Sequence, residues 1–171
     1  MAPFKTLLEE TLESWRDVRR GLIEEVESIP ADRFDFRPTP EVRSVTELLQ
    51  HILEVSLMMA GELTRPDTDF RRAPWPELLD LYAAPVKEAT NKGELLTLLQ
   101  TTIDVAEQQF LEAGELHSLQ LIERFDGLHG TRLAWLNHGI AQEMYHRGQL
   151  ALYERLMGIE PALTRRIRSS S

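Results

Sequence analysis

The side chains best suited to chemistry in this chain are a few histidines and one glutamine. His138, Gln142 and His146 follow one another at four-residue intervals within an apolar-patterned segment near the C-terminus. Residues four apart in an α-helix lie on the same face, so these three side chains should share a face. His51 lies far earlier in the chain, in the apolar stripe of another predicted helix, and should therefore point inward.

Axial spacing decides which of these side chains can hold one metal ion. With a rise of about 1.5 Å per residue, His138 and His146 lie about 12 Å apart, too far for one ion with bonds of about 2.0–2.1 Å. Neighbours four residues apart can converge, which leaves Gln142 with His146, or His138 with Gln142. A third ligand must come from another helix, and His51 is the candidate. Taken alone, His51 is better explained as a hydrogen-bonded histidine at the core edge, and Glu54 could assist it or be solvated.

A glycine in the same helix as His146 also needs a reason. Glycine inside a helix costs about 1 kcal/mol relative to alanine. Gly148 lies two residues after His146. We therefore predict that a neighbouring helix approaches closely at Gly148 and so lies near His146.

Several other chemistries lack their residues. The chain has no cysteine, which excludes disulfides, thiolate ligands and cysteine nucleophiles. It has no GxSxG, HExxH, P-loop or GxGxxG motif. The net charge of −9 disfavours binding to nucleic acid, since an acidic protein repels phosphate. No leader-like segment and no apolar stretch of about 20 residues is present, so we expect a cytoplasmic protein that does not enter membranes.

Four amphipathic segments must position the candidate residues. Apolar residues recur at three- and four-residue steps over 4–29, 44–63, 92–114 and 130–157. The sequence predicts helix starts at Pro3, at the Ser44–Glu47 capping box and at Asn91, and a stop at Gly158. The connectors 64–90 and 116–130 are predicted to be irregular, apart from a short helix near 77–84, and no segment has a strong strand period.

These elements predict the fold class. A chain of 171 residues suits one domain, and four amphipathic helices bury their stripes most simply in an all-α four-helix bundle. We assign residues 1–164 to that domain. Residues 165–171, which carry Arg165, Arg166, Arg168 and a run of serines, are predicted to be a flexible tail.

Three stretches resemble the DinB/YfiT-like family. The segment HRGQL at 146–150, followed by LMGIEP at 156–161, is similar to the family's last-helix signature. IPADRFDFRP at 29–38 is similar to its first connector, and SVTELLQHI at 44–52 is similar to its second helix, which ends in a histidine. The matches occur in the family's order and span essentially the whole chain, most weakly over 64–125.

The resemblance implies a four-helix bundle with down-up-up-down topology and one divalent metal ion, commonly zinc or nickel, on three histidines. The matching positions are His51, Gln142 and His146, so a glutamine stands where the family has a histidine. An amide oxygen is a weaker and harder ligand than imidazole, so metal affinity should fall. His138, one turn earlier, would compensate only if the ion shifted.

The resemblance also predicts a homodimer. Trp75, between two prolines in the long connector, is a candidate anchor of the kind that interfaces favour. The alternative is that Trp75 covers its own bundle.

Three functions stay open on the sequence alone. The first is a metal-dependent hydrolase or thiol-dependent transferase, in which the ion lowers the pKa of a bound water or low-molecular-weight thiol, with Arg147 or Gln149 supporting the ligands. The second is a non-catalytic stress-response or small-ligand-binding bundle with a metal-free site. In the third, the polar trio only fixes two helices together, since a fold does not imply a function.

Overall fold

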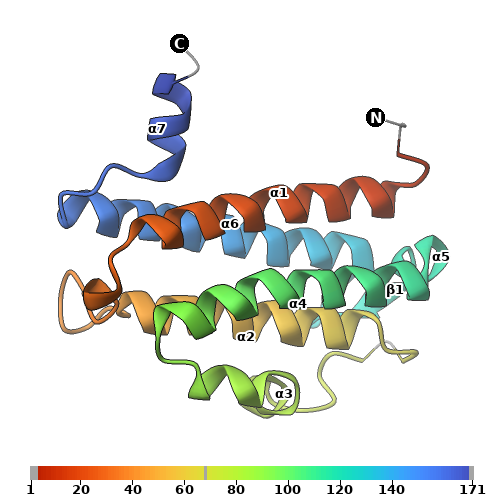
Figure 1. The fold of residues 1–171 in the computed structure, drawn as a ribbon. Coiled ribbons are helices and arrows are strands. Elements are labelled where there is room, and N and C mark those ends of the chain that lie inside the picture. Colours follow the sequence, from red (N-terminus) through yellow and green to blue (C-terminus); the bar gives the residue numbers. More distant parts are fainter. Residues whose placement is uncertain (1–3, 68, 170–171) are drawn as a thin grey trace.

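The computed structural model describes residues 4–67 and 69–169, and it is built almost entirely of helices. Four long helices lie side by side (Figure 1). They are α1 (Leu7–Ser28), α2 (Val45–Leu63), α4 (Lys92–Ala113) and α6 (Arg132–Leu156). Shorter elements are α3 (Trp75–Ala83), α5 (Glu115–Ser118), α7 (Ala162–Ser169), 3₁₀ turns at Ala31–Arg33 and Ala84–Glu88, and strands β1 (Leu121–Glu123) and β2 (His129–Thr131). The predicted all-α fold class is confirmed.

The four long helices occupy the corners of a square, in which α1 and α2 each pack against α4 and α6. Helix α1 is antiparallel to α4, as the hydrogen bond from the Lys92 side chain at the start of α4 to the Ile29 carbonyl just after α1 shows. At the other end, the Leu8 amide donates to Glu115, just after α4. Helices α1 and α6 run in one direction and α2 and α4 in the other (Figure 1). This arrangement places α2 beside α6, the two helices that carry the candidate residues.

The helix ends follow local chemistry that the sequence displays. Ser44 and Glu47 form the predicted capping box at α2, and Asn91 caps α4. Gly158 adopts φ 79° just after α6, a conformation that favours glycine. Helix α1 begins at Leu7, because the Thr6 side chain accepts the Glu9 amide there, and the predicted start at Pro3 lies outside the described residues.

A closed polar network crosses the centre of the bundle. The buried Arg19 guanidinium of α1 forms two hydrogen bonds with Glu143 of α6. It also donates to Ser56 of α2 and to the Leu99 carbonyl of α4, so one side chain ties all four long helices together. Trp15 Nε1 completes the network by donating to Glu143. The sequence pattern of α1 gave no sign that one of its many charges is buried.

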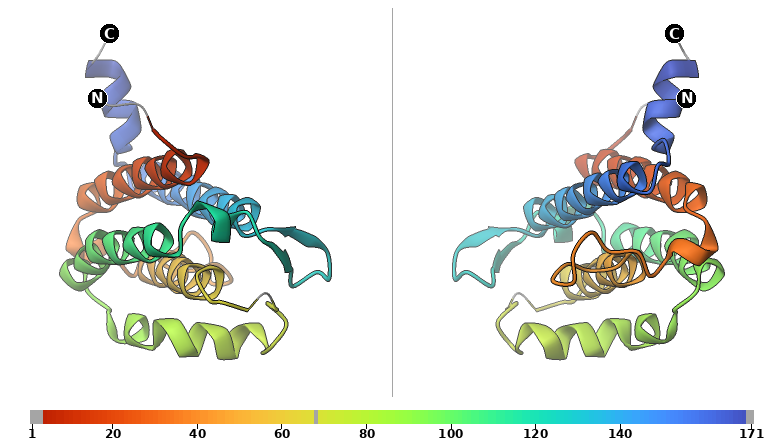
Figure 2. Two further views of the ribbon diagram at one scale, coloured as in Figure 1. Left: turned by 90° about the vertical axis from the view of Figure 1, so that its right-hand side faces the viewer. Right: turned by 90° about the vertical axis from the view of Figure 1, so that its left-hand side faces the viewer.

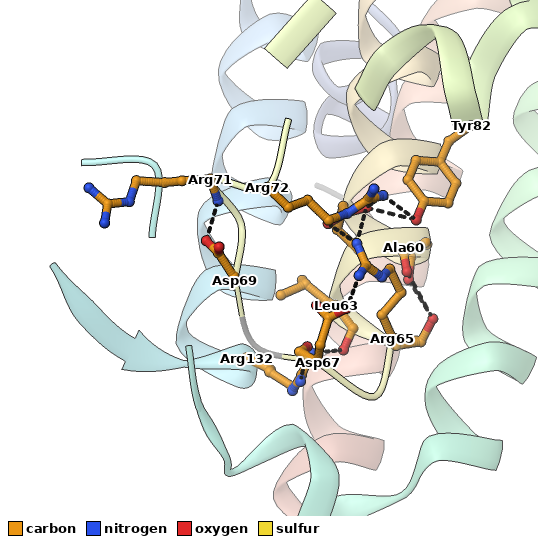
Figure 3. A network of polar contacts seen from close by, with 12 residues as sticks. Ala60, Leu63, Arg65, Asp67, Asp69, Arg71, Arg72, Tyr82 and Arg132 are labelled. Carbon is orange, nitrogen blue, oxygen red and sulfur yellow. Dashed lines mark hydrogen bonds and ion pairs between the residues drawn. The ribbon is translucent and has the colours of Figure 1, made fainter. Parts of the chain in front are cut away.

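The long connector between α2 and α4 is anchored by a second network. Glu62, 2% exposed near the end of α2, accepts hydrogen bonds from Arg72 and Tyr82. Arg132 of α6 donates to the Leu63 carbonyl and so caps the end of α2 (Figure 3). These contacts explain how a segment rich in proline is held in place and carries the ordered helix α3.

The two connectors compare differently with the sequence expectation. The short helix predicted near 77–84 is present as α3, whereas the stretch predicted to be irregular at 116–130 contains most of α5 and the short antiparallel pair β1–β2. Three-residue strands are too short to display a strand period, so the sequence carried no signal for them. Trp75 is partly buried, with its ring centroid 4.8 Å from that of Phe125. It therefore covers its own bundle, and the homodimer stays a prediction without that anchor.

The basic C-terminal segment is more regular than a flexible tail. Residues 162–169 form α7, which stands against α1 on the side of the bundle opposite α3 (Figure 2). Arg166 pairs with Glu24 of α1, and Arg168 pairs with Glu160. Residues 162–169 are thus helical in the structure, and the flexibility of the tail stays a prediction. Within the described part of the chain, no helix combines the length and apolar character that spanning a bilayer requires.

Candidate functional site

The structure brings the three predicted site residues together between α2 and α6. The imidazole centroids of His51 and His146 lie 5.0 Å apart, with the rings nearly perpendicular. Gln142 Nε2 lies 3.2 Å from His51 Nε2. The prediction that the two histidines face each other inside the bundle is confirmed.

Hydrogen bonds fix which nitrogen of each imidazole carries its proton. His146 Nδ1 donates to Gln149 Oε1 at 2.8 Å, because an amide oxygen can only accept. His146 Nε2 is then left with its lone pair. The Gln142 amide nitrogen donates to His51 Nε2, so that atom also presents a lone pair. The bond from Gln142 requires the neutral form of His51, and the bond to Gln149 sets the tautomer of neutral His146. Neutral imidazole is the form that binds metal ions.

Burial keeps both imidazoles neutral over a wide pH range. Removal from water lowers the pKa of His51 to about 4, and the positive charge of Arg43 and the nearby His146 act in the same direction. Burial also lowers the pKa of His146, although the bond to Gln149 opposes this. Protons therefore compete weakly for these nitrogens at neutral pH.

Local sequence explains the positions of the two histidines. His51 lies beside the buried Leu48 and Ile52 on α2, at the edge of the apolar stripe. His146 is 7% exposed and continues the buried face of α6 between Glu143 and Leu150. Each imidazole thus lies at the edge of the apolar core and faces the other imidazole on the neighbouring helix.

Other polar residues considered from the sequence lie elsewhere. His138 is exposed, with its ring 4.9 Å from that of Trp135, so it is separate from the trio. Arg147 turns away from His146 toward α1, where its Nη2 lies 3.7 Å from Glu25. Of the two residues predicted to support the ligands, Arg147 and Gln149, Gln149 is therefore the one that bonds to a site histidine. Arg43, whose charge acts on both histidines, was not among the predicted site residues, because it precedes α2 rather than lying on the shared face.

The explanation offered for Gly148 was wrong. A Cβ added at Gly148 would meet no atom within 4 Å, so no neighbouring helix approaches there. On the same helix, a Cβ added at Gly139 would lie 3.4 Å from the Met59 side chain of α2, an ordinary van der Waals contact.

The donor set fits a divalent ion held by two imidazoles and one amide. Among the described residues, no group of three histidine, cysteine, aspartate or glutamate side chains gathers in a way suited to a metal. His51 and His146 supply two neutral nitrogen donors from the neighbouring helices α2 and α6. Rotating the Gln142 amide by half a turn would exchange its nitrogen for its oxygen and present a third acceptor. Such a set is compatible with zinc or nickel, although it is weaker than three imidazoles.

The chain is thus a bundle of four long helices with a histidine pair between the second and the last of them. The family model described as DinB family matches residues 3–169. The chain therefore belongs to the DinB family.

Solved structures support the fold. A DinB-like protein from Bacillus subtilis, YjoA, matches with a TM-score of 0.66 and 22% identity over 87% of this chain and 92% of that one. A proposed DinB-family member from Exiguobacterium sibiricum matches with a TM-score of 0.63 and 20% identity, over 90% and 93% of the two chains.

A mycothiol-dependent maleylpyruvate isomerase has the same TM-score as the Bacillus protein, 0.66, but only 15% identity, over 88% of this chain and 63% of the isomerase. The present chain thus spans less than two thirds of that enzyme. Comparison with curated protein sequences gives no match.

Proposed function

We propose that this DinB-family protein binds a divalent metal ion at His51, Gln142 and His146 and acts on a small molecule there, such as a low-molecular-weight thiol. The observation that carries the proposal is the meeting of two neutral imidazoles, each with Nε2 as its unprotonated nitrogen, from α2 and α6. Shared fold with a mycothiol-dependent isomerase supports the thiol as the class of reactant.

The protein's own residues have separate tasks in this proposal. His51 and His146 would hold the ion, and Gln149 would keep His146 in the required tautomer through its 2.8 Å hydrogen bond. Gln142 would turn its oxygen toward the ion. When bound, a divalent ion lowers the pKa of a coordinated water or thiol, which makes a nucleophile available near neutral pH.

One observation favours a second candidate function. Gln142 already donates to His51 Nε2, so the trio is hydrogen-bonded without any ion. If the bond between Gln142 and His51 persists when metal ions are supplied, the site is metal-free and the protein is a small-ligand-binding or stress-response bundle. The two candidates differ in a measurable way, because only the first requires the amide to turn.

Calorimetric titration with zinc and nickel tests the proposal, using protein purified without a histidine tag. The proposal expects one ion per chain, with binding lost in His51→Ala and His146→Ala. Turnover of thiol conjugates by the metal-loaded protein, absent in both variants, would extend it to catalysis. Absence of stoichiometric metal binding in the wild type would favour the metal-free candidate.

A further inference from the structure

A separate cavity lies on the other side of α6, between α1, α6 and the C-terminal helix α7. Its volume is about 420 Å³, within the range of small-molecule sites. Apolar walls come from Met144, Ala151, Pro161 and Leu163. Arg147, Arg155 and Arg166 also line it, together with the two acids Asp17 and Glu25. Arg166 is paired with Glu24 of α1.

Arg147 is the group in this cavity whose bonding is incomplete. Its side chain is 14% exposed, and its Nη2 is buried without a hydrogen-bond partner among the described residues. The nearest carboxylate oxygen, on Glu25, lies 3.7 Å away, too far for a hydrogen bond. A buried donor without an acceptor costs about 1–3 kcal/mol, so an anion that reaches this guanidinium would be stabilised.

Glu25 is already engaged by another partner. Its carboxylate accepts hydrogen bonds from the backbone amides of Ala162 and Leu163, at the start of α7. The carboxylate thus fixes α7 against α1, and at 3.7 Å its Oε1 forms an ion pair with Arg147 but no hydrogen bond. Helix α7 is therefore held in place as a wall of the cavity, while Nη2 of Arg147 has no hydrogen bond among the described residues.

Two glycines shape the cavity. A Cβ at Gly21 would lie 2.2 Å from the Arg147 guanidinium, so only glycine lets this side chain cross the surface of α1. Gly148 lines the cavity and has open space where a Cβ would be. The helix-weakening glycine that no neighbouring helix explains therefore leaves room for a ligand.

We propose that this cavity binds a small amphipathic carboxylate, with its anionic head at Arg147 and its apolar chain against Met144, Ala151 and Leu163. The mixed lining supports both parts of such a ligand, since apolar walls favour the chain and the guanidinium favours a carboxylate. Arg147 and Gly148 directly follow His146 but face another way. The site is therefore distinct from the histidine site and does not depend on a metal.

The test is an NMR titration of the full chain with octanoate, compared with octanol and acetate. We expect saturable, one-to-one shifts of backbone amides around 147–151 and 161–164 with octanoate, and binding at least about tenfold weaker with either control compound, as loss of one charged bond or of the apolar chain predicts.

Gly148→Leu should fill the cavity and weaken octanoate binding at least about tenfold, because the added side chain occupies the ligand's volume. Gly93→Leu is the matched control, since Gly93 is also an exposed helical glycine at which an added Cβ would meet no atom closer than 3.5 Å. It should leave octanoate binding unchanged. Arg147→Met should weaken octanoate binding to the level of octanol. Gly148→Leu remains decisive if Arg147→Met fails to fold.

Three results would overturn the proposal. The first is the absence of saturable shifts in the wild type up to about 1 mM octanoate, a concentration that matches weak small-molecule affinity. The second is equal octanoate affinity in Gly148→Leu and Gly93→Leu. The third is equal binding of octanol and octanoate by the wild type. Zinc titration of the same variants separates this site from the histidine site, because Gly148→Leu should leave zinc binding intact.

Discussion

Helix α6 carries two polar groups that differ in how completely they are bonded. The Glu143 carboxylate accepts hydrogen bonds from both Arg19 and Trp15 of α1. Arg19 also donates to α2 and α4, so the network includes all four long helices. One turn along, His146 bonds to Gln149 through Nδ1 and turns the rest of its ring toward His51. The closed group has its bonding filled by the protein, whereas the histidine group has nitrogen lone pairs for a ligand.

This difference separates a structural role from a functional one. A buried charge is tolerated when every donor finds an acceptor, and such a network then fixes which helices pack together. Neutral imidazoles at the edge of the core cost less to bury and stay available for binding. The comparison predicts large stability effects at Arg19 and mainly binding effects at the histidine site.

The largest effect is expected from Arg19→Met. Removal of the guanidinium leaves Glu143 buried without its charge partner, which typically costs about 3–5 kcal/mol. For a domain of this size, the melting temperature should fall by roughly 10 °C. Differential scanning calorimetry measures this fall.

The double variant Arg19→Met/Glu143→Met serves as the control. It should recover part of the loss, because replacing a buried pair by apolar residues is far less costly than breaking it. Equal melting temperatures for the wild type and Arg19→Met would show that the central network is not a structural element.

The sequence predicted much of the fold and less of its polar interior. The four long helices were visible because stripes such as Leu48, Ile52 and Val55 repeat with the helical period, and caps such as Ser44 mark their ends. The burial of Arg19 was not visible, because its partners come from three other helices. Pattern along one helix cannot reveal contacts made across four.

The histidine site was predictable for a different reason. Shared helical faces and the resemblance to a family gave His51, Gln142 and His146, and the structure brings them together. The direction of Arg147 was not predictable, because it depends on Gly21 of α1. Residues adjacent in sequence on a helix point about 100° apart and can serve different sites.

Glu154→Gln tests a third kind of polar group, a buried acid that lies beside another buried acid. Glu154 is fully buried, and burial, together with the charge of Glu25 and a side-chain hydrogen bond with Glu25, raises its pKa to about 8. The folded protein then holds a proton that the unfolded chain releases near pH 4.5, so stability from this group is lost as pH rises from 4.5 through 8.

Urea unfolding at pH 5 and pH 9 measures this loss. Glutamine resembles the protonated acid, so Glu154→Gln should match the wild type at pH 5 and exceed it at pH 9 by more than about 1.4 kcal/mol, the free energy of one pKa unit. An identical change in unfolding free energy between the two pH values, in variant and wild type, would contradict the assignment of a buried proton to Glu154.

Gln149→Leu should affect binding and spare stability, in contrast to Arg19→Met. Loss of the 2.8 Å bond frees the His146 ring to rotate and change tautomer. Loss of such a supporting partner typically weakens metal binding by about 10–100-fold. Zinc titration is the measurement, and Gln50→Leu, another partly buried amide outside the trio, is the control that should bind as the wild type does. Unchanged zinc affinity in Gln149→Leu would argue against a positioning role.

The smallest effect concerns pH. Because burial lowers the pKa of both histidines, and that of His51 to about 4, zinc affinity should change little between pH 7.5 and pH 6 and fall steeply only as pH approaches 4. Zinc titrations over this range measure it. A steep fall centred near pH 6.5, the ordinary histidine pKa, would mean that the ligands are solvent-exposed.

Zinc and nickel titration of wild type and Gln142→His, side by side, tests the central claim most directly. If His51, Gln142 and His146 form a metal site, the third imidazole should tighten binding by at least about tenfold, because imidazole is a better ligand than an amide for both ions. One ion per chain in both proteins, held more tightly by Gln142→His, is the result we predict. Equal and negligible binding in both proteins would contradict the metal site and leave the trio as a hydrogen-bonded link between α2 and α6.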